Sequence, residues 1–248
     1  MHKIFFVVLT FSTLAFLACS SDDNYKSRPD IRKLVVEAIT GDSNANVQLQ
    51  GLIDTSHIGK TDFNQLHVDS LFANRKYYYS VLLEYFDPAL NLFAIYDENL
   101  KFYLLDRSLN GYLNSQWVEL DNRQFVFVQE KFLTKDVLNI DRFSIYELVD
   151  TTARLVYRSI SKFAHDKDTA NQTIEKISAD FIVTKISLRA HSNVTNQVDT
   201  FYFNQDIGKY LSKKDLFNSF VKKEIDGFEW EISKPQIPAI ELKNSPPD

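Results

Sequence analysis

The feature that most limits the fold of this chain is a period-two alternation of apolar and polar residues, which recurs from about residue 32 to residue 203. Tyrosine, phenylalanine, valine and isoleucine are frequent at the apolar positions, and short polar turns separate the runs. Successive side chains of a strand point to opposite faces of a sheet, so this pattern predicts antiparallel strands with a buried face. We expect a mainly β fold, either an antiparallel β-sandwich or a barrel.

Short loops with turn residues connect the predicted strands. Asp97-Glu98-Asn99 and Asp121-Asn122-Arg123 each separate two apolar runs, and aspartate and asparagine tolerate the left-handed backbone of tight turns. Loops of this length join antiparallel neighbours. The predicted strands cover residues 77–86, 91–96, 100–105, 112–120, 124–131, 142–148, 153–160, 181–190 and 197–203.

One helix is predicted near the C-terminus, packed on the β domain. Ser212 can cap it, Asp215 stands at the capping-box position, and Gly227 can end it. Its apolar stripe comprises Leu216, Phe217, Phe220 and Val221. A second, shorter helix is predicted over residues 167–178.

The first 18 residues have the composition of a signal peptide. A basic start, Met1-His2-Lys3, precedes an uncharged apolar run from Ile4 to Ala18. This run is shorter than the roughly 20 residues that a transmembrane helix needs. We therefore expect residues 1–18 to be removed.

Cys19, the only cysteine, follows this run directly. Leu14-Ala15-Phe16-Leu17-Ala18-Cys19 resembles the lipobox of bacterial lipoproteins, although Phe16 stands where leucine is usual and Leu17 where a smaller residue is usual. The resemblance implies that the Cys19 sulfur is acylated and that the protein is tethered to a membrane without a spanning helix. The alternative is ordinary secretion with cleavage after Ser20.

Acidic residues follow the cysteine closely. Asp22 and Asp23 resemble the export signal of Bacteroidota-type lipoproteins, which implies the outer membrane and exposure at the cell surface. Alternatively, the two aspartates only keep a linker solvated. We interpret residues 19–30 as a flexible tether, residues 31–233 as a single β-rich domain and the proline-punctuated residues 234–248 as an extended tail.

Composition argues against several classes of function. The net charge is −5, and no cluster of lysine and arginine is present to neutralise nucleic-acid phosphates. The six glycines lack the spacing of a dinucleotide fingerprint or a P-loop. We therefore expect neither a nucleic-acid partner nor a cofactor.

The segment that begins at Asp106 resembles the start of a calcium loop. Asp106, Ser108 and Asn110 supply oxygen ligands at alternate positions, and Gly111 allows a sharp turn. However, Trp117 stands where the family places a bidentate glutamate, and Asn-Gly is also a strong hairpin signal. We expect a plain turn and no metal.

Four aromatic residues are candidates for a ligand platform: Tyr77, Tyr79, Trp117 and Trp230. Aromatic side chains can present flat faces to sugar rings or apolar ligands, but burial in the core is their usual role. In an extended strand Tyr78 faces away from Tyr77 and Tyr79, so at least one side of this strand belongs to the core.

No catalytic residue is predicted, because the Gly-x-Ser-x-Gly elbow of serine hydrolases is absent. The preferred hypothesis is a membrane-anchored envelope lipoprotein whose β domain binds an unknown protein or carbohydrate. One alternative is an extracellular polymer hydrolase with paired carboxylates. Another is a structural subunit of an envelope assembly, which would expose a large apolar patch.

Overall fold

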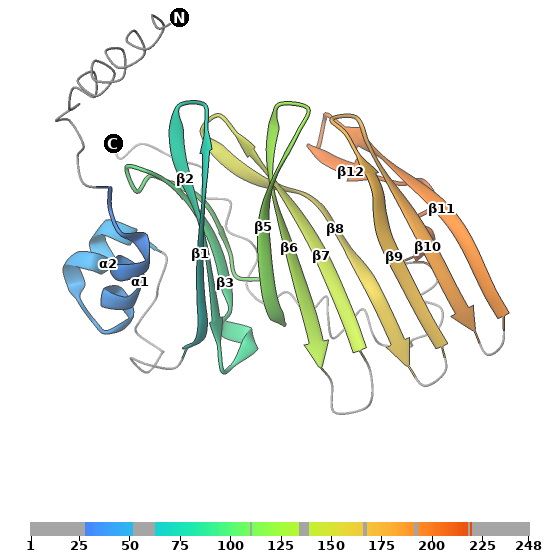
Figure 1. The fold of residues 1–248 in the computed structure, drawn as a ribbon, viewed down its shortest axis with the longest axis horizontal. Coiled ribbons are helices and arrows are strands. Elements are labelled where there is room, and N and C mark those ends of the chain that lie inside the picture. Colours follow the sequence, from blue (N-terminus) through green and yellow to red (C-terminus); the bar gives the residue numbers. More distant parts are fainter. Residues whose placement is uncertain are drawn as a thin grey trace, which may run out of the picture.

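The computed structural model describes residues 28–51, 63–109, 111–133, 139–165, 168–190, 193–217 and 219. This part of the chain is mainly β and contains two antiparallel sheets, which confirms the predicted class (Figure 1). Sheet A has the order β1-β2-β3-β4, and sheet B has the order β12-β11-β10-β9-β8-β7-β6-β5. Each strand in both sheets therefore pairs with its neighbours in sequence, as the short loops predicted.

Sheet A comprises β1 (Phe63–Ala73), β2 (Lys76–Tyr85), β3 (Leu92–Asp97) and β4 (Phe102–Asp106), with a short 3-10 turn at Pro88–Leu90. Sheet B comprises β5 (Tyr112–Leu120), β6 (Arg123–Leu133), β7 (Asn139–Val149), β8 (Thr152–His165), β9 (Asp168–Ile177), β10 (Phe181–Ala190), β11 (Asn193–Asn204) and β12 (Lys209–Leu211).

Two-residue left-handed turns close two of the hairpins. Asn74 and Arg75, between β1 and β2, have φ values of 51° and 62°, and Asp121 and Asn122, between β5 and β6, have φ values of 51° and 61°. Backbone with this twist matches the right-handed twist of the flanking strands. The turn predicted at Asp121-Asn122 therefore forms for the expected reason.

Two helices lie within residues 31–49, so the strand pattern predicted from about residue 32 is wrong in this segment. Helix α1 (Ile31–Ile39) begins at Asp30, whose carboxylate accepts the Lys33 N–H, and α2 (Ser43–Leu49) begins at Asp42. These N-caps satisfy amide groups that would otherwise lack partners at the helix starts. The buried residues of α1 have helical spacing: Ile31, Val35, Ala38 and Ile39.

The helix predicted over residues 167–178 is wrong, because this segment forms β9. Strand β9 pairs with β10 along nearly its whole length, from Ile177 opposite Ile182 to Thr169 opposite Arg189. Tertiary pairing therefore overrides a weak local helical pattern.

The described residues do not establish the predicted C-terminal helix beyond its first turn: Leu216, Phe217 and Ser219 are helical, and the Ser219 N–H donates to the Asp215 carbonyl oxygen at 3.0 Å. The Ser212 hydroxyl accepts the backbone N–H groups of Lys214 and Asp215, both at 3.1 Å, as expected for a cap. However, Asp215 has a φ of 41°, so the helical backbone begins after Asp215 and not directly after the predicted cap, Ser212. Phe217 is fully buried, and most of the predicted helix lies outside the described residues.

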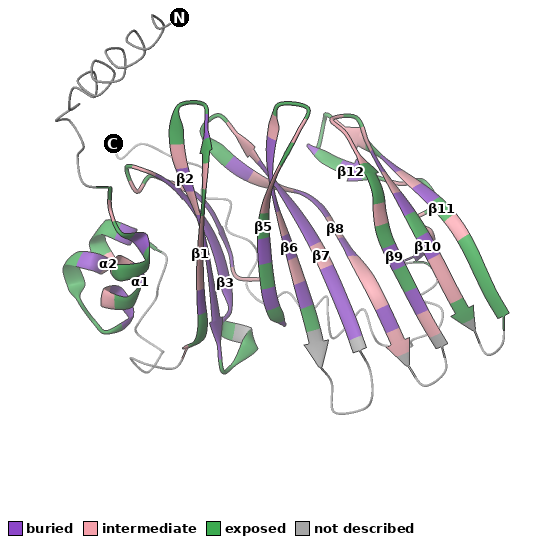
Figure 2. Cartoon of the chain, viewed as in Figure 1, coloured by how far each residue is buried: buried purple, intermediate pink, exposed green. Residues whose placement is uncertain are grey.

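Sheet A lies between the two helices and sheet B. One face of sheet A packs against α1 and α2, and the Tyr96 hydroxyl donates to the carbonyl oxygen of Leu49 at the end of α2. The opposite face packs against sheet B, as in a β-sandwich. Buried residues concentrate in β2, β3 and the central strands of sheet B (Figure 2). The interface between the two sheets packs one set of residues, Tyr78, Leu82, Phe93, Ile95, Tyr103, Leu104 and Leu109, against sheet B residues Leu113, Val126, Val128, Tyr146 and Ala153.

Sheet B curls so that its last strands return toward its middle. A single apolar cluster joins β6, β7 and β8 to β10, β11 and β12, and β12 contacts β8. Arg123 of β6, which pairs with Glu147 of the adjacent strand β7, also donates to the carbonyl oxygen of Ala179 at 2.9 Å and so joins the middle of sheet B to the turn between β9 and β10. Strands β6–β8 therefore have sheet A on one face and the curled end of sheet B on the other.

Candidate ligand-binding cleft

Strands β8 and β9 pair over only part of their length. The ladder joins Lys162–His165 to Asp168–Asn171 and then stops. From there β8 continues paired only with β7, and β9 continues paired only with β10. The facing edges of residues 152–161 and 172–177 therefore have no strand partner within the described part of the chain.

Irregular pairing accompanies this separation. The register between β7 and β8 shifts between Asp141 and Arg142 and again between Ile145 and Tyr146, and the register between β9 and β10 shifts between Val183 and Thr184. A bulge bends the strand that carries the extra residue and increases its local twist. These shifts explain how two neighbouring strands can diverge after a short common ladder.

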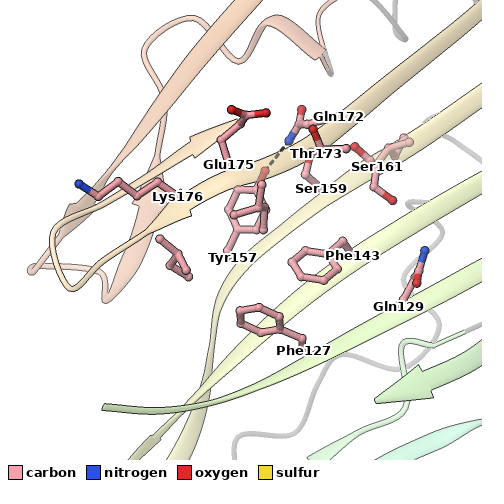
Figure 3. A pocket seen from close by; sticks show the side chains of 13 residues that line it. Phe127, Gln129, Phe143, Tyr157, Ser159, Ser161, Gln172, Thr173, Glu175 and Lys176 are labelled. Atoms are coloured by element: carbon pink, nitrogen blue, oxygen red, sulfur yellow. Dashed lines mark hydrogen bonds between the residues drawn. The ribbon is translucent and has the colours of Figure 1, made fainter. Parts of the chain in front are cut away.

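A cleft of about 460 Å³ opens where β8 and β9 diverge. Its volume falls in the range of about 300–1,000 Å³ that is typical of small-molecule sites. The apolar lining residues are Phe127, Phe143, Ile160, Ile174 and Ile177, and the polar ones are Gln129, Tyr157, Ser159, Ser161, Gln172, Thr173, Glu175 and Lys176 (Figure 3).

Gln172 of β9 and Tyr157 of β8 meet in the cleft. The Gln172 Nε2 group donates to the Tyr157 hydroxyl at 2.6 Å. Gln172 is only 7% exposed, yet its Oε1 atom has no hydrogen-bond partner. Burial raises the pKa of Tyr157, so the hydroxyl keeps its proton at physiological pH. The cleft therefore contains a buried acceptor without a partner beside a neutral hydroxyl.

Few charged groups line the cleft. Glu175 and Lys176 are its only ionisable residues besides Tyr157, and both are exposed. They are adjacent in sequence and opposite in sign, so they contribute little net charge. The buried part of the cleft is therefore apolar or neutral and polar.

Asp106 and Ser108, which resemble the start of a calcium loop in the sequence, lie in a polar network between the two sheets. Asp106 is completely buried, and its carboxylate accepts from Arg158 at 2.8 Å, from the Tyr146 hydroxyl at 2.7 Å and from the Ser108 hydroxyl at 2.6 Å. Burial opposes ionisation of Asp106, but the Arg158 charge and the hydrogen bonds from Ser108 and Tyr146 outweigh it, so the pKa is lowered.

A second ion pair extends this network. Arg142 pairs with the fully buried Glu130 and also donates to the carbonyl oxygen of Ser108 at 2.6 Å. The oxygens of Asp106 and Ser108 are thus engaged by arginine side chains, whereas Asn110 lies outside the described residues. Among the residues that the structure describes, no group of three or more His, Cys, Asp or Glu is placed to hold a metal ion.

Gly111 is needed at the end of this loop for close packing. A Cβ at this position would lie 2.6 Å from the carbonyl oxygen of Lys131 in β6, too close for any other residue without a backbone shift. The glycine noted for its place in a cation loop therefore allows β5 to begin directly beside β6.

The candidate aromatic platform is dispersed over the fold. Tyr77 is half-buried, with the Arg28 guanidinium 3.6 Å from its ring centre, and Tyr79 packs against the cluster beneath the helices. Tyr78 faces the opposite way and is only 2% exposed, which confirms the expected alternation. Trp117 packs between the sheets, and Trp230 lies outside the described residues. None of the three described residues lines the cleft.

The predicted lipidation site, Cys19, and the predicted export signal, Asp22 and Asp23, also lie outside the described part of the chain. Within that part, neither helix has the length and apolar character required to cross a membrane.

Sequence reasoning missed the cleft residues. Phe127 and Phe143 were recognised only as apolar strand positions, and Gln172 fell in the segment predicted as a helix. No local signal distinguishes them, because the cleft arises from the divergence of two strands.

Comparison with known proteins adds no assignment. The chain matches no protein-family model, and searches against curated proteins and solved structures gave no match.

Proposed function

We propose that this protein is a lipid-anchored envelope protein whose β domain binds a small ligand in the cleft between β8 and β9. Cys19 directly after an apolar signal sequence supports the anchor, and Asp22 and Asp23 support export to the outer membrane. The domain would then present the cleft at a membrane surface. The ligand could be a free small molecule or a part of a larger carbohydrate or protein.

The observation that carries the binding proposal is the cleft itself. It combines a volume of about 460 Å³, an apolar lining with aromatic side chains and a buried polar atom that has no protein partner. Nine buried side-chain atoms of the described residues have no hydrogen-bond partner, and only Gln172 Oε1 belongs to a residue that lines the cleft. Its place at the cleft supports a ligand as the partner that it lacks.

A cleft-filling substitution tests this proposal. Ile174→Trp should occupy the apolar part of the cleft, whereas Val198→Trp, on the exposed face of β11, is the matched control. With the uncharged dye Nile red as the probe, we expect Ile174→Trp to weaken binding at least about 10-fold and Val198→Trp to leave it unchanged. Equal dye binding by both variants would show that the cleft is not the site.

Membrane attachment is tested separately. Cys19→Ala should move the protein from the membrane fraction to the soluble fraction, because the acyl chains would have no attachment point. Asp22→Asn combined with Asp23→Asn should protect the domain from protease added to whole cells. A Cys19→Ala variant that still sediments with membranes would contradict the lipid anchor.

The hydrolase alternative has less support. A glycosidase needs two carboxyl groups that face each other across the substrate. Glu175 is the only carboxylate among the residues that line the cleft, and the buried carboxylates of Asp106, Glu130 and Glu147 are all paired with arginine.

The alternative of a structural subunit is favoured by one observation. Val194, Val198 and Tyr202 lie on the same face of β11 and are all more than half exposed. Replacing Val194 and Val198 by lysine should dissociate any envelope complex seen by cross-linking in whole cells, and an unchanged cross-linking pattern would count against this role.

A further inference from the structure

We infer that the cleft between β8 and β9 selects an uncharged amphipathic ligand, with a hydroxyl-bearing head and an apolar chain, of which an alkyl glycoside is the simplest representative. This inference depends on the proposed binding function and specifies its ligand class. Three observations support it. Most polar lining residues are separate from the apolar ones, Gln172 has an unpaired acceptor, and none of the buried residues that line the cleft is charged.

The lining has two chemically distinct sides. In Figure 3, Ser159, Ser161, Gln172 and Thr173 gather on one side, whereas Phe127 and Phe143 lie on the other, with Gln129 as the one polar residue labelled beside them. The two phenylalanine rings contact each other edge to face, with their centres 5.2 Å apart. A ligand that fills the whole cleft must therefore carry both an apolar part and a hydrogen-bonding part.

The Gln172–Tyr157 pair determines what the polar part must offer. Gln172 Nε2 donates to the Tyr157 hydroxyl, and the Gln172 Oε1 atom has no donor among the described residues, so a donor on the ligand would satisfy it. Reversing the amide would exchange the two atoms and would still leave one buried amide group without its partner. A sugar hydroxyl suits either case, since it both donates and accepts.

The lining of the cleft argues against ligands whose head group carries a charge. A carboxylate or phosphate head would lie beside neutral serine and glutamine side chains, and none of the buried lining residues is a cation. An ammonium head would find no carboxylate among the buried lining residues, and the buried Asp199, whose charge acts on Tyr157, already accepts from the Ser212 hydroxyl and the Leu216 N–H. Burying an uncompensated charge is strongly unfavourable. No arginine lines the cleft, and Arg123 and Arg154 of the neighbouring strands pair with Glu147. A neutral head incurs no such cost.

Three probes with the same eight-carbon tail test the inference: octyl glucoside, octyl sulfate and octylammonium. The full chain carrying Cys19→Ala avoids interference from its own acyl groups, and titration calorimetry below the micelle concentration measures the affinities. We expect octyl glucoside to bind at least about 10-fold more tightly than either charged probe. Equal or tighter binding of a charged probe would overturn the inference.

Two variants locate the head group. Gln172→Met keeps the side-chain volume but removes the acceptor, so glucoside affinity should fall about 10-fold while Nile red affinity stays within about two-fold. Ser161→Ala is a smaller change that should lower glucoside affinity about three-fold if Gln172→Met fails to fold. Gln116→Met, on the exposed side of β5, is the matched control.

The outcomes separate the two proposals. If Nile red binds and Ile174→Trp blocks it, but octyl glucoside fails to bind, the cleft is a ligand site and the inferred class is wrong. If Nile red binding does not depend on Ile174, the binding function itself is wrong. Unchanged glucoside affinity in both Gln172→Met and Ser161→Ala would also overturn the inferred position of the head group.

Discussion

The two faces of strands β6–β8 differ in what lies next to their buried polar groups: a network of ion pairs on the face toward sheet A, and an open cleft on the face toward the curled end of sheet B. On the face toward sheet A, the Asp106 carboxylate accepts from three side chains and Glu130 pairs with Arg142. On the face toward the curled end of sheet B, Gln172 keeps an unpaired oxygen beside a cleft. A network that satisfies its own members stabilises one arrangement of the core, whereas an unsatisfied group beside open volume is suited to binding.

The largest expected effect concerns Arg158, which compensates the buried Asp106 charge. Arg158→Met should lower the free energy of unfolding by about 3–5 kcal/mol, because it leaves a carboxylate buried without its cation. Urea unfolding measures this loss, with Lys131→Met on the exposed side of β6 as the control. A loss below about 1 kcal/mol would mean that the inter-sheet network contributes no more than an ordinary surface pair.

A smaller effect concerns the pH dependence of stability. The pKa of Asp106 is lower in the folded protein than its ordinary value of 3.8, so ionisation of this group stabilises the fold. This contribution is fully present above about pH 4 and is lost as the pH falls through the folded pKa. Asp106→Asn should be less stable at neutral pH, and its stability should depend less on pH below about pH 4. Parallel pH profiles for the two proteins would contradict the lowered pKa.

The smallest expected effect is at the cleft. Gln172→Met should change the free energy of unfolding by no more than about 1 kcal/mol, since it removes one hydrogen bond to Tyr157 together with one unsatisfied atom. Thermal or urea unfolding without ligand provides the measurement. A loss as large as that of Arg158→Met would place Gln172 among the structural residues and would remove the contrast between the two faces.

The strands show how far local pattern could predict the fold. The predicted ranges 112–120 and 181–190 coincide with β5 and β10, and the other predicted strands overlap β2, β3, β4, β6, β7, β8 and β11. Period-two alternation and turn residues are local properties, so they can be read without knowledge of the fold. The N-terminal helices could also have been found, because Asp30 and Asp42 each precede a segment with helical apolar spacing.

The candidate site could not be predicted in the same way. Asp106 and Ser108 have the spacing of cation ligands, yet their oxygens are used by Arg158, which is distant in sequence. The platform residues Tyr77 and Trp117 are aromatic, but they lie in different layers of the fold. Residue type therefore indicated candidates, while long-range contacts decided their surroundings.

By itself, the sequence determined the β class, the order of the hairpins and the expectation of a lipid anchor at Cys19, because alternation, turn chemistry and a signal peptide each depend on neighbouring residues. Only the tertiary structure decided that β8 and β9 separate after a short ladder and that Gln172 keeps an unpaired oxygen in the resulting cleft. The divergence accompanies register shifts in β8 and β9 and the long-range contacts that curl sheet B, such as the hydrogen bond from Arg123 to Ala179, and these contacts join residues whose proximity no local pattern encodes.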